Sequence, residues 1–340
     1  MGPSLTRLRV GACLSLTGRF APFGRQAARG LEAWRSLGSG AELTIEDDGS
    51  DRERLTACIP HLARRCDLLL GPYSTGLTRT AAALARDLDV LIWNHGGAGD
   101  HAQALSPRHM VSVLTPASRY MEPFLAHLTS HQARAPVWIA AGRGRFGRQV
   151  ADGAEAIASR LGVETVRAGT TPRPFDGVPA VWDLACAGSF EEDVATVLKA
   201  RRLTRPPREM CAVAAGVRRF AGAVEEPAGM YGVAQWIPGV AHATHAGPAE
   251  ADFLTAYAAL SGATPDYPGA QAAATAALAV HCARLAGSVA PDALWEAATQ
   301  LDLSTFFGWF RIDEDGAQVA HRTVLVRWDE SGAFRSMASG

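Results

Sequence analysis

The sequence alternates short apolar, β-like runs with stretches long enough to form a helix, and it does so in two successive sets. The first set reads LRVGACLSL, GRQAARGLEAWRSL, AELTIEDD, a helix through 55–65, CDLLLGP, a helix over 77–86, and DVLIWN. Strands that alternate with helices of about 10–15 residues predict βαβ units and a parallel sheet. Glycine and proline mark the strand ends, as in GPYSTG and NHGGAG.

A second set begins after HMVSVLTPAS. It predicts helices over 119–131, 148–161 and 190–202, and strands at 136–141, 163–168, AVWDLAC and EMCAVAA. With 340 residues the chain is long enough for two cores, so two α/β lobes are expected. The alanine-rich run GAQAAATAALAVHCARLAG predicts a helix packed closely against a sheet. The closing FFGWFRIDEDGAQVAHRTVLVRWDESGAF predicts a hairpin around Asp-Glu-Asp-Gly.

Composition narrows the classes of partner. A net charge of −1 gives no reason to expect nucleic acid or an anionic membrane as partner. No run approaches the roughly 18 apolar residues of a membrane span, and no secretory h-region is visible. We therefore expect no direct membrane insertion. The protein is expected in the cytoplasm if Met1 is the native start, and in the periplasm or at the cell surface if a leader was removed.

The cysteines and histidines do not form a metal-binding pattern. Six cysteines are scattered without a C-x-x-C pair, so the spacing of a zinc site is absent. Cys13, Cys186 and Cys211 lie in apolar runs, where a free thiol behaves as a small buried hydrophobe, which favours a reducing compartment. His242-x-x-His245 is the only close histidine pair and has no third ligand nearby. No metal site is expected.

Gly142, Gly144 and Gly147 have the G-x-G-x-x-G spacing of a dinucleotide-binding loop. Such a loop normally follows the first strand of its domain, and its ribose-binding acid ends the second strand. Here the only acid nearby, Glu164, stands at the beginning of strand 163–168. We therefore expect no NAD, no FAD and no other cofactor.

Two glycine-containing loops follow predicted strands and are candidate binding sites. In GPYSTG, Ser74 resembles the nucleophile of a hydrolase elbow, but the spacing is one residue too long; an α/β hydrolase-type enzyme using Ser74 with His95 is the alternative from another class. Ser74 or Thr75 is a natural helix N-cap, and the helix N-terminus suits a carboxylate or amide oxygen. In WNHGGAG the glycines expose backbone groups, and His95 is a pH switch, a base or a structural hydrogen-bonding residue.

The whole chain resembles a known family. The runs VGACLSLTGRFAPFGRQAARGLEAW, ELTIEDDGSD, DLLLGPYSTGLTRTAAALARDLDVLIWNHGGA, FLTAYAAL, PDYPGAQAAATAAL and FFGWFRIDEDGAQVAHRTVLVRWD occur in that order. They resemble type I periplasmic binding proteins of the leucine/isoleucine/valine-binding class, which includes cytoplasmic amide sensors. The specific motifs are Thr17-Gly18 with Phe23-Gly24, Glu46-Asp47-Asp48, Gly71-Pro72 and Asp313–Gly316.

The resemblance implies two similar three-layer α/β lobes with parallel sheets, joined by a three-strand hinge. Lobe 1 is expected over 1–117 and 243–305, and lobe 2 over 118–242 and 306–340. It also implies non-enzymatic binding of a small polar solute (an amino acid, amide or carboxylate) in a cleft with hinge closure, as the substrate-binding component of an ABC transporter. The partner would be an ABC permease or, for the alternative of a cytoplasmic sensor that controls expression, a regulator.

The resemblance also implies the ligand-binding residues. They are Tyr73, Ser74, Thr75, Asn94, His95, Gly96, Gly97 and Ala98 in lobe 1, and Tyr120, Phe146, Ser189 and Phe190 in lobe 2. Thr75 matches the hydroxyl that binds the ligand carboxylate, and Phe146 with Gly147 matches an aromatic-glycine pair. Gly97-Ala98 lacks the second hydroxyl of the family, for which Asn94 and His95 are the candidate replacements.

One departure from the family concerns the ligand. The glutamate that pairs with the ligand's amino group falls near Ala215, and the family's leader peptide and N-terminal disulfide cysteine are missing as well. A buried ammonium needs a compensating charge. Free branched-chain amino acids are therefore expected to bind weakly, and a carboxylate, amide or aromatic acid better, unless Asp183 replaces the glutamate.

Overall fold

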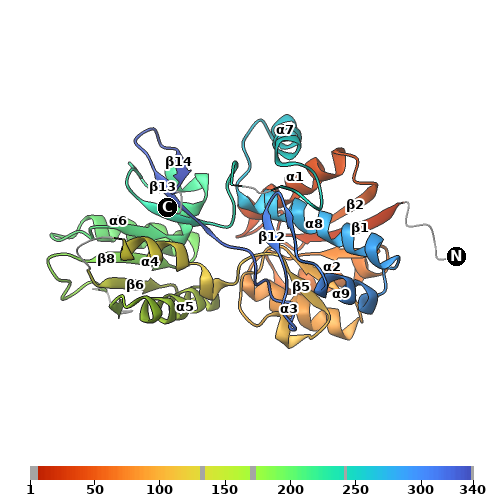
Figure 1. The fold of residues 1–340 in the computed structure, drawn as a ribbon, viewed down its shortest axis with the longest axis horizontal. Helices are drawn as coiled ribbons and strands as arrows, with labels where there is room; N and C mark the ends of the chain where they lie inside the picture. The colour runs from red at the N-terminus through yellow and green to blue at the C-terminus, as the bar shows by residue number, and fades with distance from the viewer. Residues whose placement is uncertain (1–6, 131–134, 169–173, 241–242, 338–340) are drawn as a thin grey trace. The chain divides into compact units, whose positions relative to one another are not determined.

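The computed structural model describes residues 7–130, 135–168, 174–240 and 243–337. The chain divides into two compact units (Figure 1). Unit 1 comprises Met1–Thr115 and Pro238–Arg322, and unit 2 comprises Pro116–Ile237 and Thr323–Gly340. The chain therefore passes between the units three times, and the residues on either side of each passage lie outside the strands.

The boundaries expected from the sequence differ from these units mainly in one segment. Residues 306–322 belong to unit 1, whereas the sequence places them in lobe 2. Two contacts within unit 1 explain the assignment. The Phe306 ring stacks on Phe253 with centroids 4.5 Å apart, and the Ser112 amide donates to the Gly316 carbonyl.

Unit 1 is built on a five-stranded parallel sheet in the order β2-β1-β3-β4-β5. Its strands are β1 (Leu8–Leu14), β2 (Ala41–Asp47), β3 (Leu68–Leu70), β4 (Ile92–Asn94) and β5 (Met110–Ser112). Its helices are α1 (Ala21–Ser36), α2 (Arg52–Ala63), α3 (Thr75–Asp87), α7 (Glu250–Ser261), α8 (Tyr267–Ala286) and α9 (Pro291–Thr299), with a 3-10 turn η1 (Gln103–Leu105) and a hairpin of β11 (Leu303–Thr305) and β12 (Gly308–Phe310).

Helices cover both faces of this sheet. Core residues of α2 and α3, such as Ile59 and Ala81, pack against one row of strand side chains that includes Ile92. On the other face α8, the light-blue helix of Figure 1, lies against α1. A Cβ on Gly30 of α1 would lie 2.0 Å from the carbonyl oxygen of Gly269 in α8, so only glycine permits this approach. α8 also contacts β3 and β4, so the predicted packing of the alanine-rich helix against a sheet is confirmed.

Unit 2 is built on a seven-stranded sheet in the order β14-β13-β10-β9-β8-β6-β7. The strands from β10 to β7 are parallel, while β13 and β14 are added as an antiparallel hairpin. The strands are β6 (Val137–Ala141), β7 (Thr165–Arg167), β8 (Asp183–Ala187), β9 (Met210–Ala212), β10 (Tyr231–Ala234), β13 (Val324–Trp328) and β14 (Phe334–Ser336). The helices are α4 (Glu122–Thr129), α5 (Arg145–Leu161) and α6 (Phe190–Arg201), with 3-10 turns η2 (Ala117–Arg119), η3 (Val213–Gly216) and η4 (Arg218–Gly222).

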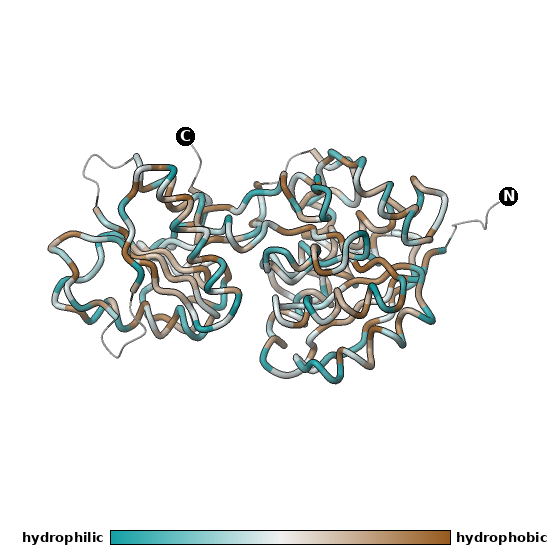
Figure 2. The backbone as a smooth tube through the Cα atoms, turned by 90° about the horizontal axis from the view of Figure 1, so that it is seen from below, coloured by the Kyte–Doolittle hydropathy of each residue, from teal (hydrophilic) through white to brown (hydrophobic). Residues whose placement is uncertain are grey.

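In both units, hydrophobic residues gather along the strands, and hydrophilic and hydrophobic residues alternate along the helices (Figure 2). This is the pattern of helices that bury one face against a sheet. Among the described residues no single helix is long and apolar enough to cross a membrane, and only α8 with α9, bent by 104°, meets that test as a pair.

The predicted C-terminal hairpin differs in detail from the structure. Asp313–Gly316 forms a turn in unit 1, closed by an isolated bridge between Ile312 and Gln318. The regular hairpins lie on either side of it, as β11-β12 in unit 1 and β13-β14 in unit 2. Apolar alternation alone does not separate these three features, because β11 and β12 pair with each other whereas β13 pairs with β10 in the sheet of unit 2.

Candidate functional site

The two glycine-containing loops of unit 1 lie side by side. They follow β3 and β4, which are neighbouring parallel strands, so both loops leave the carboxyl end of the sheet. Beyond the strands the pairing continues as a bridge between Tyr73 and Gly96, and the Ser74 amide donates to the Gly96 carbonyl at 3.1 Å. In open α/β sheets this edge is where ligands bind.

Ser74 caps helix α3, as the sequence predicts. Its Oγ accepts a hydrogen bond from the Leu77 amide at 3.4 Å, and its backbone has φ 85°. Thr75 is the first helical residue and its side chain is 7% exposed. A helix N-terminus presents unpaired amides and a partial positive charge, which together suit an anionic oxygen.

The loop after β4 is seated tightly on the first turn of α3. A Cβ on Gly97 would lie 1.9 Å from Oγ1 of Thr78, and a Cβ on Gly99 would lie 2.2 Å from Cγ2 of Thr75. Side chains are therefore excluded at both positions without a rearrangement. This packing explains why glycine stands at position 97.

Asn94 shapes this loop. It is fully buried, and its Nδ2 donates to the Gly97 carbonyl at 2.8 Å and to Ser112 Oγ at 2.7 Å. Its Oδ1 accepts from the Gly97 amide at 2.8 Å. Every hydrogen bond found for this amide is internal, so ligand binding by Asn94 stays a prediction.

His95 is fully buried, and within the described chain neither ring nitrogen has a hydrogen-bond partner. Burial lowers the pKa of this imidazole to about 4, so the ring is neutral near pH 7. The alternative of a Ser74–His95 hydrolase pair needs the base within hydrogen-bond reach of the nucleophile. No such bond joins the two side chains in the structure.

An aromatic cluster at the same edge was not predicted. The Tyr73 ring stacks on Phe23 with centroids 4.9 Å apart, and Phe20 lies 6.0 Å away. The Tyr73 hydroxyl lies 3.3 Å from that of Tyr267, the first residue of α8. Phe23-Gly24 belongs to the family motif, which was the one available signal for this cluster.

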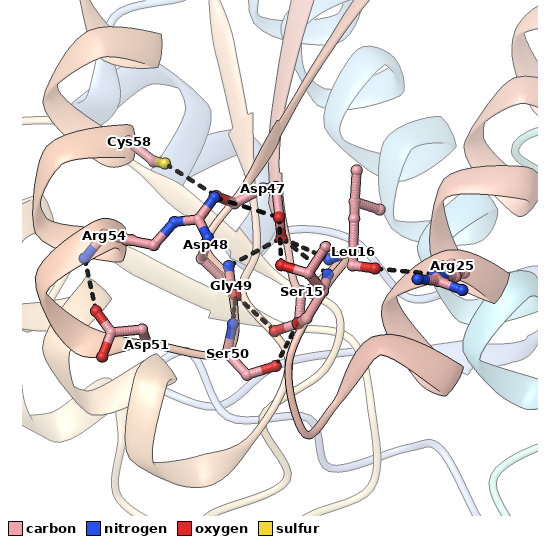
Figure 3. Close-up of polar contacts among 11 residues, drawn as sticks. Ser15, Leu16, Arg25, Asp47, Asp48, Gly49, Ser50, Asp51, Arg54 and Cys58 are labelled. Atoms are coloured by element: carbon pink, nitrogen blue, oxygen red, sulfur yellow. Dashed lines mark hydrogen bonds and ion pairs between the residues drawn. The ribbon is translucent and has the colours of Figure 1, made fainter.

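Asp47 and Asp48 of the acidic motif hold the loop after β1, which leads into α1 (Figure 3). Asp47 Oδ1 accepts from the amides of Leu16 and Thr17, and Asp48 Oδ1 accepts from Ser15 Oγ at 2.7 Å. Burial by itself raises the pKa of Asp47, but these hydrogen bonds outweigh it, and the pKa lies below its ordinary value. Asp47 and Asp48 thus accept hydrogen bonds from the loop after β1 and hold it in place.

In unit 2 the loops after β6, β8 and β9 share the carboxyl end of the sheet. Ser189 caps α6 in a capping box with Glu192. The Glu192 carboxylate accepts from the Ser189 amide at 2.9 Å and from the Arg143 amide at 3.0 Å. Asp193, also in α6, accepts from the amides of Gly188 at 2.7 Å and Ala214 at 2.9 Å. Two acids of one helix thus tie three loops together.

The G-x-G-x-x-G stretch is a strand-to-helix turn. A Cβ on Gly147 would lie 2.4 Å from the Ala187 carbonyl oxygen, and the Gly142 amide donates to that same oxygen at 2.8 Å. The Arg143 amide is bonded to Glu192. A Cβ on Gly142 would lie 2.7 Å from Cα of Gly188, so close packing explains two of the three glycines. The Glu192 carboxylate already accepts from an amide that a phosphate would use.

The predicted aromatic residues of unit 2 form two separate pairs. Phe146 makes an edge contact with Tyr120, with centroids 5.4 Å apart, and Tyr120 is 4% exposed. Phe190 is partly buried against the core and lies under the guanidinium of Arg219, 4.4 Å from the ring centre. Arg219 was not predicted as a site residue.

Two positions, Ala215 and Asp183, are candidates for an acid that pairs with a ligand ammonium, and neither places a carboxylate at the binding loops. Ala215 is fully buried in the core of unit 2, and its carbonyl accepts from Trp328 Nε1 at 2.8 Å. Asp183 begins β8 and therefore stands at the amino end of the sheet, where its Oδ2 pairs with Arg208 at 2.6 Å. The alternative that Asp183 replaces the glutamate is not supported, because its ion pair with Arg208 lies at the opposite edge from the binding loops.

No group of three or more potential metal-ligating His, Cys, Asp or Glu side chains occurs in the described ranges. Of the histidine pair, His242 lies outside the described residues, and His245 Nδ1 lies 2.8 Å from Ser304 Oγ. All six cysteines are unpaired thiols.

Comparison with known proteins agrees with this fold. A family model described as periplasmic binding protein matches residues 7–185 and 186–333. A leucine-binding protein LivK from Thermotoga maritima superposes with a TM-score of 0.81 at 15% identity, covering 97% of this chain and 98% of that one. LivJ from Streptococcus pneumoniae in complex with isoleucine gives 0.76 at 16% identity, covering 98% of both.

A solute-binding protein of an ABC transporter from Rhodopseudomonas palustris, in complex with 3,4-dihydroxybenzoic acid, gives a TM-score of 0.80 at 14% identity, covering 98% of this chain and 97% of that one. No curated protein matches the sequence. The family model covers nearly the whole chain, and the two α/β units carry their loops at the carboxyl ends of parallel strands, as described above. The chain belongs to the periplasmic binding protein family.

Proposed function

We propose that the protein binds a small polar solute, without chemical change, as the substrate-binding component of an ABC transporter. The observation that carries this proposal is the start of α3. There the cap Ser74, the first helical residue Thr75 and the loop at Gly96–Ala98 converge. Hinge closure on binding is part of the proposal.

A carboxylate is the group best suited to this place. The N-terminal amides and hydroxyls of α3 offer donors in a field that favours negative charge. The three molecules named for the related structures, leucine, isoleucine and 3,4-dihydroxybenzoic acid, all carry a carboxylate. Thr75 and Ser74 are accordingly the proposed carboxylate anchor.

The rest of the solute is proposed to lack a free ammonium group. Two of the three acids in the first turn of α6, Glu192 and Asp193, accept hydrogen bonds from backbone amides. Ala215 is buried, and Asp183 is paired elsewhere. A carboxylate, amide or aromatic acid is therefore the proposed ligand class, in preference to a free branched-chain amino acid.

The proposed partner is an ABC permease, which implies a location outside the cytoplasmic membrane. One observation favours the alternative of a cytoplasmic sensor that acts on a regulator of expression: all six cysteines are unpaired thiols, as in a reducing compartment. Both functions use the same binding loops, and neither requires catalysis.

A panel of carboxylates, amides and amino acids in thermal-shift assays, run beside esterase and dehydrogenase assays, tests the proposal. A ligand at 100 times its Kd stabilises the folded state by about 2.7 kcal/mol. We expect saturable stabilisation by at least one acid without turnover. Mass spectrometry of material that co-purifies with the native protein identifies the natural ligand. Turnover of an ester or a hydroxy acid at this site would instead support the enzyme alternative.

A further inference from the structure

Cys13 and Cys58 face each other inside unit 1. Cys13 stands near the end of β1 and is fully buried in the core that β1 shares with α2. Cys58 belongs to α2, is half-buried and packs against the same core. A side-chain hydrogen bond joins the two thiols. The fold therefore brings into contact two thiols that lie far apart in the sequence.

The way in which α2 lies over β1 explains this contact. A Cβ on Gly11 would lie 3.2 Å from Cδ2 of Leu62, so position 11 of the strand faces Leu62 of the helix. Alternate residues of a strand share a face, and so do residues four apart on a helix. Two strand residues span about 6–7 Å and four helix residues about 6 Å, so Cys13 comes opposite Cys58. Cys58 Sγ also donates to the Asp47 carbonyl at 3.7 Å, at the end of the neighbouring strand β2 (Figure 3).

Other cysteines of the chain are placed differently. Cys186 and Cys211 lie on the neighbouring strands β8 and β9, but their register is offset by one residue, so their side chains point to opposite faces of the sheet. The Cys66 thiol lies beside Gly11, and Cys282 is buried in α8 on the other face of the unit 1 sheet. Contact between two thiols is therefore a specific feature of Cys13 and Cys58.

We propose that Cys13 and Cys58 form a reversible disulfide when an external disulfide is present as the oxidant, and that this bond fastens β1 to α2 beneath the loop after β1. The Cys58 thiolate attacks a sulfur of the external disulfide, and one thiol leaves. The Cys13 thiolate then attacks the Cys58 sulfur of the mixed disulfide, and a second thiol leaves. The two cysteines lose two electrons and two protons, and the oxidant takes up both.

Exposure and thiol pKa set the order and the rate of these steps. Cys58 is reached first, because it is half-buried whereas Cys13 is fully buried. Burial, with the carboxylates of Glu46 and Asp48 nearby, raises the pKa of both thiols. Since the thiolate is the nucleophile, the bond should form slowly near neutral pH and faster as the pH rises.

The two locations considered for the protein predict opposite states of this pair. Disulfides persist outside the cytoplasmic membrane, whereas the cytoplasm keeps thiols reduced. The exported substrate-binding component would therefore carry the bond, and the cytoplasmic sensor would carry two thiols. The inference itself does not rest on the proposed function, because it concerns the core of unit 1 and involves no solute.

Mass spectrometry of the folded full chain after incubation with oxidised glutathione tests this inference. Remaining thiols are blocked, and trypsin then releases the peptides 10–19 (VGACLSLTGR) and 55–64 (LTACIPHLAR), each with a single cysteine. We expect these two peptides to be joined, and to be joined faster at higher pH. The bond should also raise the midpoint of thermal unfolding, because it restricts the unfolded chain, and dithiothreitol should reverse that shift.

Cys58→Ser and Cys66→Ser are the matched variants. Serine keeps a donor near the Asp47 carbonyl at position 58, so this variant should fold, but it should lose both the joined peptides and the thermal shift. Cys66→Ser removes another thiol that lies against β1 and should keep both. Thermal unfolding under reducing conditions checks that each variant is folded.

Three results would overturn the inference. The first is a folded wild-type chain in which Cys58 carries glutathione or stays a free thiol and is not joined to Cys13. The second is a bond from Cys58 to Cys66 instead. The third is joined peptides that form only in denaturant, where pairing does not depend on the fold. Each of these results leaves the proposed function standing, which the ligand panel tests separately.

Discussion

The hydroxyl of Thr78 occupies the space that a side chain on Gly97 would need, since a Cβ there would lie 1.9 Å from Oγ1. This contact seats the loop after β4 against the first turns of α3. The loop in turn holds the Gly96 carbonyl where it accepts from the Ser74 amide. The start of α3 and the loop after β4 therefore hold each other in place.

Gly97→Ala should destabilise the fold by roughly 1–3 kcal/mol, because the extra methyl group overpacks a buried contact. Gly76→Ala, in the first turn of helix α3, is the control, because an added Cβ there meets nothing within 4 Å. It should be neutral or stabilising, since alanine favours the helix. Chemical denaturation of both variants measures the difference. Equal stability of the two variants contradicts the tight seating of the loop.

Ser74→Ala combined with Thr75→Val should weaken binding of the best acid of the panel by about ten- to a hundredfold, the effect of losing hydrogen bonds to a charged group. Loss of the cap also costs about 0.5–2 kcal/mol of stability, so the variant is less stable but folded. Calorimetry gives the affinity, and the single Ser74→Ala variant separates the effect of the cap. Unchanged affinity in the double variant removes both residues from the site.

The buried His95 predicts a pH dependence of stability. Its pKa is about 4 in the folded protein, below the ordinary 6.5, so the unfolded chain binds the proton more readily. Its contribution to stability is therefore present above about pH 6.5 and is lost as the pH falls towards 4. The loss amounts to roughly 3 kcal/mol over the window from pH 6.5 to 4.

His95→Gln measured against the wild-type protein isolates this contribution. The variant's loss of stability should be smaller at pH 4.5 than at pH 7. The direct comparison is needed because Asp193 acts in the opposite sense. Burial raises the pKa of Asp193 to about 7, so its contribution is present below about pH 4 and is lost as the pH rises to 7. A stability difference between His95→Gln and wild type that is independent of pH contradicts a buried neutral imidazole.

The alternation of strands and helices was predictable because the pattern is local. The strand ends at Leu70 and Asn94 and the cap at Ser74 follow from residues within a few positions of each other. The pairings that complete the candidate site are not local. Tyr73 meets Tyr267 across 194 residues, and Arg219 reaches Phe190 from a neighbouring loop.

Two further points needed the structure. The sequence alone does not show at which end of the sheet Asp183 lies, because the first and last residues of the strand are not known. In the structure β8 begins at Asp183, which places this acid at the amino end. The sequence also does not show that the Asn94 side-chain amide donates to Gly97 and Ser112, because these hydrogen bonds depend on where the two acceptors lie in the fold. The family resemblance predicted the binding loops, while the internal contacts within them came from packing.

The central claim is that the protein binds an acid or amide that lacks a free ammonium group. Titration of leucine, valine, their deaminated acids and the matching amides by calorimetry tests it most directly. The account predicts saturable binding of an acid or amide and at least about tenfold weaker binding of leucine, because no acid is available for a buried ammonium. Micromolar binding of leucine, with the deaminated acid giving no heat, would contradict the account and identify an ordinary amino-acid receptor.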